Sequence, residues 1–277
     1  MRGAPDSMRL IRPRNADEAL REYTRRPEAL PLAGGTDFMV MWNMGLLNNR
    51  TVLDLSGVRE WSGIRKEADR IRIGSLATHS RIQSHPEIRK HLPLLAEACS
   101  TIGAKQIQNR GTLGGNIANA SPAGDSFPPL AVYEATVRTI SPRGHRDYPM
   151  TEVFAGVKKT VFGPSELIES IDVPIPARAN RRMFRKIGTR AAQAISKTVA
   201  AGMLWLKRDK SVRELRFALG SVAPTMKRLK HVEDLVRGRK LAGPIIKKAC
   251  ALLEKDISPI DDIRSTKLYR LEVSRNL

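Results

Sequence analysis

Apolar residues in the first 175 positions recur with two spacings, and each spacing predicts a different kind of element. Intervals of three and four residues predict helices at about 15–25, 36–47 and 91–102. Asn15 and Glu18 form a capping box at the start of the first helix. Short alternating or continuous apolar runs predict strands at 29–33, 52–55, 70–76, 136–141 and 166–173. These elements follow no regular βαβ rhythm, which indicates a mixed α and β domain.

Residues 106–125 interrupt this pattern, because Gly, Asn, Thr and Ser replace most of the apolar residues. Their composition predicts an irregular segment without helix or strand. A further helix is predicted directly after it. Asp125 or Ser126 can cap that helix, and its first turn tolerates Pro128 and Pro129.

The region after residue 176 predicts an antiparallel hairpin followed by two helices. Apolar stretches at 197–207 and 212–222 are separated by a polar turn, and helical spacing returns at 245–253 and 263–273. A small sheet backed by helices forms an α+β layer. The predicted domains are therefore 1–175 and 176–277.

Charge is distributed unevenly between these two domains. The 277 residues include 48 Lys and Arg against 28 Asp and Glu, a net charge of +20. Residues 177–277 contain 25 basic and 9 acidic side chains, whereas the first 176 residues contain 23 and 19. This excess indicates an acidic partner subunit, a phosphate-bearing cofactor or nucleic acid, with a solvated basic face as the plain alternative. Because no RNA-binding aromatic string accompanies it, nucleic acid is the least favoured partner.

Several protein classes are excluded by what the sequence lacks. Cys99 and Cys250 have no CxxC spacing, which excludes an internal iron–sulfur cluster or cysteine zinc site and argues against a disulfide scaffold. No apolar run approaches the roughly 20 residues that cross a bilayer, and the first residues carry no secretory pattern, so we expect a cytoplasmic protein. Met8 is an alternative start. No nucleophile elbow or HExxH motif is present, so any enzyme activity would depend on a cofactor.

A glycine pair lies where the predicted strand 29–33 meets the helix that starts at Thr36. Gly34 and Gly35 allow a tight turn that directs consecutive backbone N–H groups toward one point. A diphosphate would fit there, and a valine at Gly34 would occupy its space; the alternative is a turn with no ligand. The residues of this segment are Pro31, Leu32, Ala33, Gly34, Gly35, Thr36, Asp37 and Phe38.

A second glycine pair, Gly114 and Gly115, lies in the polar segment 106–125. Thr112 and Asn116 supply hydrogen-bonding side chains beside it. Ordering so polar a segment is costly unless a ligand occupies it. Neither glycine segment matches GxGxxG or GxxxxGK[ST], which excludes a Rossmann site or a P-loop. Two strand-adjacent glycine pairs instead favour one shared phosphate-bearing ligand.

The sequence resembles the FAD-binding medium subunits of molybdenum hydroxylases, a family that includes xanthine dehydrogenases and carbon monoxide dehydrogenases. The strings that begin at Phe184 and Gly220 are most similar to the xanthine dehydrogenase branch. The matching segments, in the order of the family, are 32–37, 73–79, 110–125, 184–190, 220–225 and 261–266.

The resemblance implies an α+β chain: a two-part FAD-binding domain of the vanillyl-alcohol-oxidase type, then a small α+β C-terminal domain with an antiparallel sheet. It implies that the two glycine segments meet over the FAD diphosphate, and that Thr112 and Asn116 donate to its phosphates. It assigns no catalytic acid, base or metal ligand to this chain. The other residues that it places at FAD are Ile102, Gly111, Leu113, Gly114, Gly115, Asp125, Ile168 and Lys186.

In this family a molybdopterin-binding large subunit oxidises the substrate, and a 2Fe-2S small subunit passes the electrons to FAD. The resemblance therefore implies an electron-transfer subunit of a hetero-oligomeric complex, with NAD or another acceptor receiving the electrons. Two alternatives stay open at this point. One is a stand-alone flavin-dependent oxidoreductase of the same fold, and the other is a basic nucleic-acid-binding module.

Overall fold

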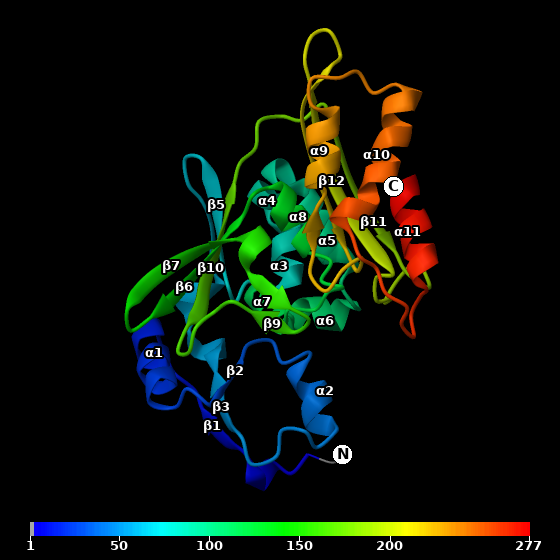
Figure 1. Cartoon of the computed structure of the whole chain (residues 1–277). Coiled ribbons are helices and arrows are strands. Elements are labelled where there is room, and N and C mark those ends of the chain that lie inside the picture. Colours follow the sequence, from blue (N-terminus) through cyan, green and yellow to red (C-terminus); the bar gives the residue numbers. More distant parts are fainter. Residues whose placement is uncertain (1–2) are drawn as a thin grey trace.

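The computed structural model describes residues 3–277, and its N-terminal part is a small parallel sheet (Figure 1). The strands β1 (Arg9–Ile11), β2 (Leu30–Leu32) and β3 (Thr51–Asp54) pair in the order β1–β3–β2. The crossover helices are α1 (Ala16–Arg25) and α2 (Phe38–Asn43). The predicted cap is confirmed, because the Asn15 side chain accepts a hydrogen bond from the Glu18 amide at 2.9 Å. The return bond of a full capping box is shifted by one residue, since the Glu18 carboxylate accepts from the Arg14 amide at 2.9 Å.

An antiparallel sheet forms the second part of the same domain. Its order is β4–β5–β10–β6–β7, so the last strand of the domain lies between two earlier ones. Its strands are β4 (Ile64–Lys66), β5 (Arg70–Gly74), β6 (Thr136–Ser141), β7 (Gly144–Pro149) and β10 (Leu167–Pro174). Helices between the strands contribute to the same buried core, which includes α3 (His79–Ser84), α4 (Pro86–His91), α5 (Pro93–Thr101) and α8 (Phe127–Val132).

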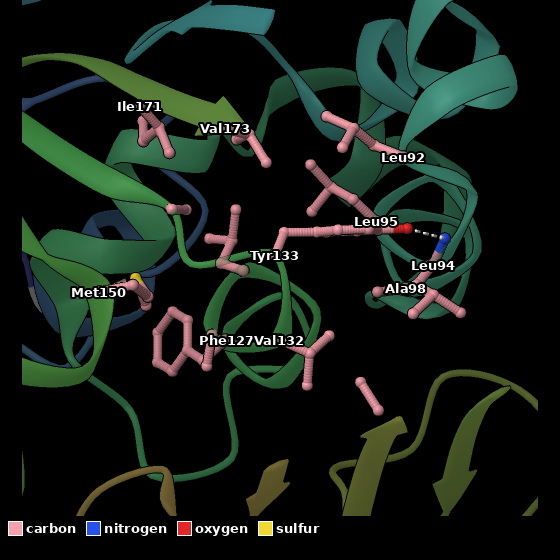
Figure 2. Close-up of a cluster of buried hydrophobic side chains, with 14 of the residues drawn as sticks. Leu92, Leu94, Leu95, Ala98, Phe127, Val132, Tyr133, Met150, Ile171 and Val173 are labelled. Carbon is pink, nitrogen blue, oxygen red and sulfur yellow. Dashed lines mark hydrogen bonds between the residues drawn. The ribbon is translucent and has the colours of Figure 1, made fainter. Parts of the chain in front are cut away.

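Tyr133, directly after α8, ties two of these helices together (Figure 2). Its side chain is 1% exposed, and its hydroxyl accepts a hydrogen bond from the Leu94 amide at 3.1 Å. The ring contributes apolar area to the core, while the hydroxyl satisfies a donor at the start of α5. Burial also raises the pKa of the Tyr133 phenol, which stays protonated.

The C-terminal domain is a four-stranded antiparallel sheet with helices on one face (Figure 1). Its strands are β11 (Arg181–Ile187), β12 (Thr198–Leu206), β13 (Val212–Gly220) and β14 (Lys227–Arg228). The helices are α9 (Lys230–Val236), α10 (Gly243–Asp256) and α11 (Lys267–Asn276). The predicted hairpin and the helix predicted at 245–253 are therefore confirmed. The helix predicted at 263–273 is also present, but it begins only at Lys267, because residues 262–265 form a turn.

Strand β12 is buried on both faces because it lies between two cores. Val199, Ala201 and Met203 belong to the core of the first domain, whereas Ala200 belongs to the core beneath α9 and α10. Successive side chains on a strand point to opposite faces of the sheet. One face of β12 therefore packs on the first domain and the other face on the helices of the C-terminal domain, so β12 connects the two cores.

The prediction that residues 106–125 lack helix is wrong. They hold most of α6 (Lys105–Arg110) and all of α7 (Leu113–Asn119). Thr112 caps α7 by accepting a hydrogen bond from the Gly115 amide at 3.0 Å, and Leu113 and Ile117 are fully buried one turn apart. Tertiary burial and a cap thus outweigh the low helix propensity of the glycines.

The predicted helix 91–102 is confirmed as α5, which begins two residues later, at Pro93, because α4 ends at His91. Another predicted helix needs correction. The helix expected at 36–47 is only six residues long. Part of the basic excess of the C-terminal domain is neutralised inside it, since Arg228 of β14 is a buried partner of Glu233 in a pair with an N–O distance of 2.7 Å.

The remaining elements are short, and none of the helices within residues 3–277 has the length and hydropathy needed to cross a membrane. They are the 3₁₀ turns Pro5–Ser7, Leu55–Gly57, Arg59–Ser62 and Met150–Glu152, and the hairpin of β8 (Phe154–Gly156) and β9 (Lys159–Thr160).

Candidate cofactor-binding site

A cavity of about 470 Å³ lies between the N-terminal sheet and helices α6 and α7, a size typical of small-molecule sites. Both glycine segments line it. The structure brings together at this cavity all eight residues of 31–38, together with Ile102, Gly111, Thr112, Gly114, Gly115, Asn116 and Ile168. Leu113, Asp125 and Lys186 are not part of the lining.

Five consecutive backbone amides of the first glycine segment, at residues 33–37, have no hydrogen-bond acceptor in the part of the chain that the structure describes. The five residues that carry these donors follow the end of β2 and line the cavity; residues 33–36 are half-buried and Asp37 is exposed. A row of unpaired amides in a concave wall forms a binding site for an anion. The segment therefore fits a phosphate group.

Gly34 has a different role from the predicted one. A Cβ atom on Gly34 would lie 1.8 Å from the carbonyl oxygen of Arg110, inside the protein and not in the cavity. A valine here would push the two glycine segments apart, so the expectation that it fills the diphosphate space is wrong. Gly35 has a φ of +79°, a left-handed conformation that glycine adopts at low cost.

In the second glycine segment the backbone amides donate hydrogen bonds to other groups of the protein. Leu113 N–H donates to Ala77 at 3.0 Å, Gly114 N–H to Ser75 at 2.8 Å, and Asn116 N–H to Thr112 at 2.9 Å. A Cβ on Gly114 would lie 2.6 Å from the Cβ of Ser75. Gly114 therefore permits close packing of α7 on the sheet, and this segment offers side chains to a ligand rather than a row of amides.

Two polar side chains of the second segment retain donors for a ligand. The Thr112 hydroxyl accepts from the Gly115 amide, which leaves its proton free to donate. The Asn116 carbonyl oxygen accepts from the Ser126 hydroxyl at 2.7 Å, and its NH₂ group bonds to no other residue of 3–277. Two apolar side chains also line the cavity: Ile102, directly after α5, and Ile168 of β10.

His79 lines the same cavity and was not singled out by the sequence. Its side chain is 2% exposed, and its Nδ1 atom lies 3.6 Å from the sulfur of Cys99. Burial lowers the pKa of His79 to about 4, so the imidazole is neutral near pH 7. The available signal was its place at the end of the matching segment 73–79.

Asp125 and Lys186 bind each other behind the cavity wall. The Lys186 ammonium lies 2.6 Å from the Asp125 carboxylate and donates to the carbonyl of Thr101 at 2.8 Å. The Ser196 hydroxyl also donates to Asp125. Burial raises the pKa of Asp125, while Lys186 and Ser196 oppose that rise. The pair joins β11 of the C-terminal domain to the residue that precedes Ile102.

The fold and the cavity together define a two-domain cofactor-binding protein whose anion site lies in the N-terminal domain. A family model described as the FAD binding domain in molybdopterin dehydrogenase matches residues 6–176. A second model, the CO dehydrogenase flavoprotein C-terminal domain, matches residues 183–277. The chain therefore belongs to the family of FAD-binding medium subunits of molybdenum hydroxylases.

Individual relatives agree with this assignment over nearly the whole chain. The glyceraldehyde dehydrogenase medium chain of Sulfolobus acidocaldarius is 28% identical, over 99% of this chain and 96% of the relative. A putative xanthine dehydrogenase FAD-binding subunit of Escherichia coli is 29% identical, over 94% and 89%. A solved carbon monoxide dehydrogenase structure from Hydrogenophaga pseudoflava superimposes with a TM-score of 0.92 at 27% identity, covering 99% of this chain and 95% of that one.

These findings confirm the predicted family and the order of its two domains, and the cofactor of the N-terminal domain is FAD. The chain is an oxidoreductase subunit, as its relatives are dehydrogenase subunits. No cluster of three or more His, Cys, Asp or Glu side chains in residues 3–277 is arranged to hold a metal ion.

Proposed function

We propose that this chain is the electron-transfer subunit of a molybdenum hydroxylase complex. It receives electrons from the 2Fe-2S clusters of a small subunit and passes them as hydride to NAD, while a molybdopterin-binding large subunit oxidises the substrate. The observation that carries this proposal is the row of unpaired amides at residues 33–37, on a cavity inside an FAD-binding domain.

Different residues of the cavity would bind different parts of FAD. The amides of 33–37 would hold the diphosphate, and the Thr112 hydroxyl and the Asn116 NH₂ group would donate to its oxygens. Ile102 and Ile168 would provide an apolar wall against the bound cofactor. Lys186 and Asp125 fix the position of Ile102 through the carbonyl of Thr101.

FAD supplies the hydride and one-electron chemistry when it is bound. The chain itself would bind and orient the cofactor, and the neutral imidazole of His79 adds no charge to the cavity near pH 7. We also propose a domain division at residues 175 and 176, because β10 ends at Pro174 and β11 begins at Arg181.

Spectroscopy of the intact complex tests the proposed function. The chain is purified with its partner subunits, and its visible spectrum is recorded before and after addition of the reducing substrate. We expect flavin bands that bleach with the substrate and recover when NAD is added, with formation of NADH. A complex without flavin bands would contradict the cofactor role, and recovery with another acceptor but not with NAD would contradict the proposed acceptor.

A further inference from the structure

A tightly bonded turn precedes α11 in the C-terminal domain. The Asp262 carboxylate accepts hydrogen bonds from the amides of Arg264 at 2.8 Å and Ser265 at 3.0 Å. The Asp262 amide donates to the Ser265 carbonyl at 3.1 Å. Thr266 then caps α11 by accepting from the Tyr269 amide at 3.2 Å. In Figure 1 this segment is the orange-red loop at the lower end of α11.

Buried Arg270 attaches this turn to the sheet. Its side chain donates to the Asp262 carboxylate at 2.8 Å, to the Lys197 carbonyl at 2.6 Å and to the Ser221 carbonyl at 2.7 Å. Arg270 is 3% exposed, and a buried guanidinium is stable only where it has such partners. The turn is therefore held in one conformation relative to β12 and β13.

Apolar side chains in the rigid turn and directly on either side of it are exposed to solvent. Ile263 at the tip is 99% exposed. Single exposed apolar residues are common, whereas four within ten residues of the chain, around a fixed turn, point to an interaction site. We name this group the Ile263 knob; its members are Ile260 (66% exposed), Ile263, Leu268 (67%) and Tyr269 (41%).

The Ile263 knob lies at the end of the C-terminal sheet that meets the cavity wall. Ile187 of β11 pairs with Thr198 of β12 at this end. Lys197 beside it places its ammonium 4.7 Å from the ring of Tyr269. Lys186 at the same end donates to the carbonyl of Thr101, next to Ile102 of the cavity.

We propose that the Ile263 knob docks into an apolar pocket on the iron–sulfur subunit. The inference rests on the proposed function, because an electron donor has to approach the cofactor cavity closely, and the knob lies at that end of the domain. Lys267 forms no ion pair within residues 3–277, and Arg264 only a loose one of 3.9 Å with Asp262. These two cations are therefore available to pair with carboxylates of the partner around the docked knob.

A matched pair of serine substitutions tests this surface, both by binding of the iron–sulfur subunit to the full-length chain and by the composition of the complete complex. Ile263→Ser removes the tip of the knob. Ile246→Ser removes an isoleucine of 50% exposure from α10, outside the knob. The affinity of each variant for the purified iron–sulfur subunit is measured by titration, together with iron, molybdenum and FAD contents and the mass of the isolated chain by sedimentation.

We expect Ile263→Ser to weaken binding of the iron–sulfur subunit about 10- to 100-fold, as for a central interface residue, and Ile246→Ser to leave it unchanged. FAD content should be normal in both variants, which separates this proposal from the proposed function. Wild-type affinity in Ile263→Ser would overturn the proposal. So would selective loss of the molybdenum subunit, or a shift from dimer to monomer of this chain alone.

A second variant tests the need for a rigid turn. Arg270→Lys keeps the charge but cannot reach Lys197, Ser221 and Asp262 together, so the turn loses its anchor while Ile263 stays. We expect an intermediate loss of affinity for the iron–sulfur subunit. An affinity equal to that of the wild type would show that the held conformation does not contribute to docking.

Discussion

The two glycine segments look alike in sequence but serve the cavity in different ways. In the first, residues 33–37 keep their amides free, and Gly35 supplies the left-handed conformation that this bend needs. In the second, the amides of residues 113–116 are all bonded, and Gly114 lets α7 pack on Ser75. A glycine pair can thus mark either an anion site or a close packing contact, and only the hydrogen bonds tell the two apart.

The largest expected effect comes from the contact between the two segments. In Gly34→Ala the new methyl group would overlap the carbonyl of Arg110, which lies 1.8 Å from its Cβ position. We expect a loss of about 3 kcal/mol or more in the free energy of unfolding, measured with urea, and loss of FAD on gel filtration. Gly243→Ala is the control, since its Cβ would meet no atom within 4 Å. A free energy of unfolding equal to that of the wild type in Gly34→Ala would show that the close contact between the two glycine segments does not stabilise the fold.

Acid should lower the free energy of unfolding by protonating His79. This residue contacts the second glycine segment, because its amide donates to the carbonyl of Gly111 at 3.0 Å. Burial lowers its pKa to about 4 from 6.5, so the unfolded chain binds the proton more readily than the folded one. Stability therefore falls as the pH drops from about 6.5 toward 4, by roughly 3 kcal/mol in total. Urea unfolding across this range should show a weaker dependence in His79→Asn. An identical pH dependence in both proteins would contradict a neutral buried imidazole.

Removal of one free amide should weaken FAD binding specifically. Asp37 has a φ of −88°, about 20° from the value that proline prefers, so Asp37→Pro deletes an N–H group at the cost of a small backbone adjustment. One hydrogen bond to a charged phosphate contributes about 1.5–3 kcal/mol, which corresponds to roughly 10- to 100-fold in Kd. Asp37→Ala retains the amide and serves as the control for loss of the side chain. Equal Kd values for FAD in the two variants, by calorimetry on the apoprotein, would argue against an amide contact.

The smallest expected effect concerns Thr112, which both caps α7 and lines the cavity. Substitutions there can show whether it also contributes to the binding of FAD. Thr112→Ala and Thr266→Ala each remove a helix cap, so each should lose about 1 kcal/mol of stability. Only the first should also bind FAD more weakly, because only Thr112 lines the cavity. Thr112→Ser should restore both properties. A Kd for FAD that is unchanged in Thr112→Ala would reduce Thr112 to a structural role.

Local patterns predicted much of the fold. The helix cap at Asn15, the hairpin of β12 and β13, and the strand that became β10 each depend on residues close together in the chain. The helix α7 could not be predicted this way, because its stability comes from burial of Leu113 and Ile117 against residues far away in sequence.

The same limit applies to the site. The sequence located both glycine segments, and the cavity lies between them. Composition could not reveal which amides stay unpaired, since that depends on acceptors such as the carbonyls of Ser75 and Ala77. Nor could it reveal that Asp125 pairs with Lys186, which lies in the other domain.

Amide hydrogen exchange tests the contrast between the segments most directly. Exchange is followed by mass spectrometry on the apoprotein and after addition of FAD, in peptides that cover residues 33–37 and 113–116. We expect FAD to slow exchange strongly at 33–37, where the amides gain acceptors, and only slightly at 113–116, where they are already bonded. Bound FAD with unchanged exchange at 33–37 would show that these amides do not hold its diphosphate.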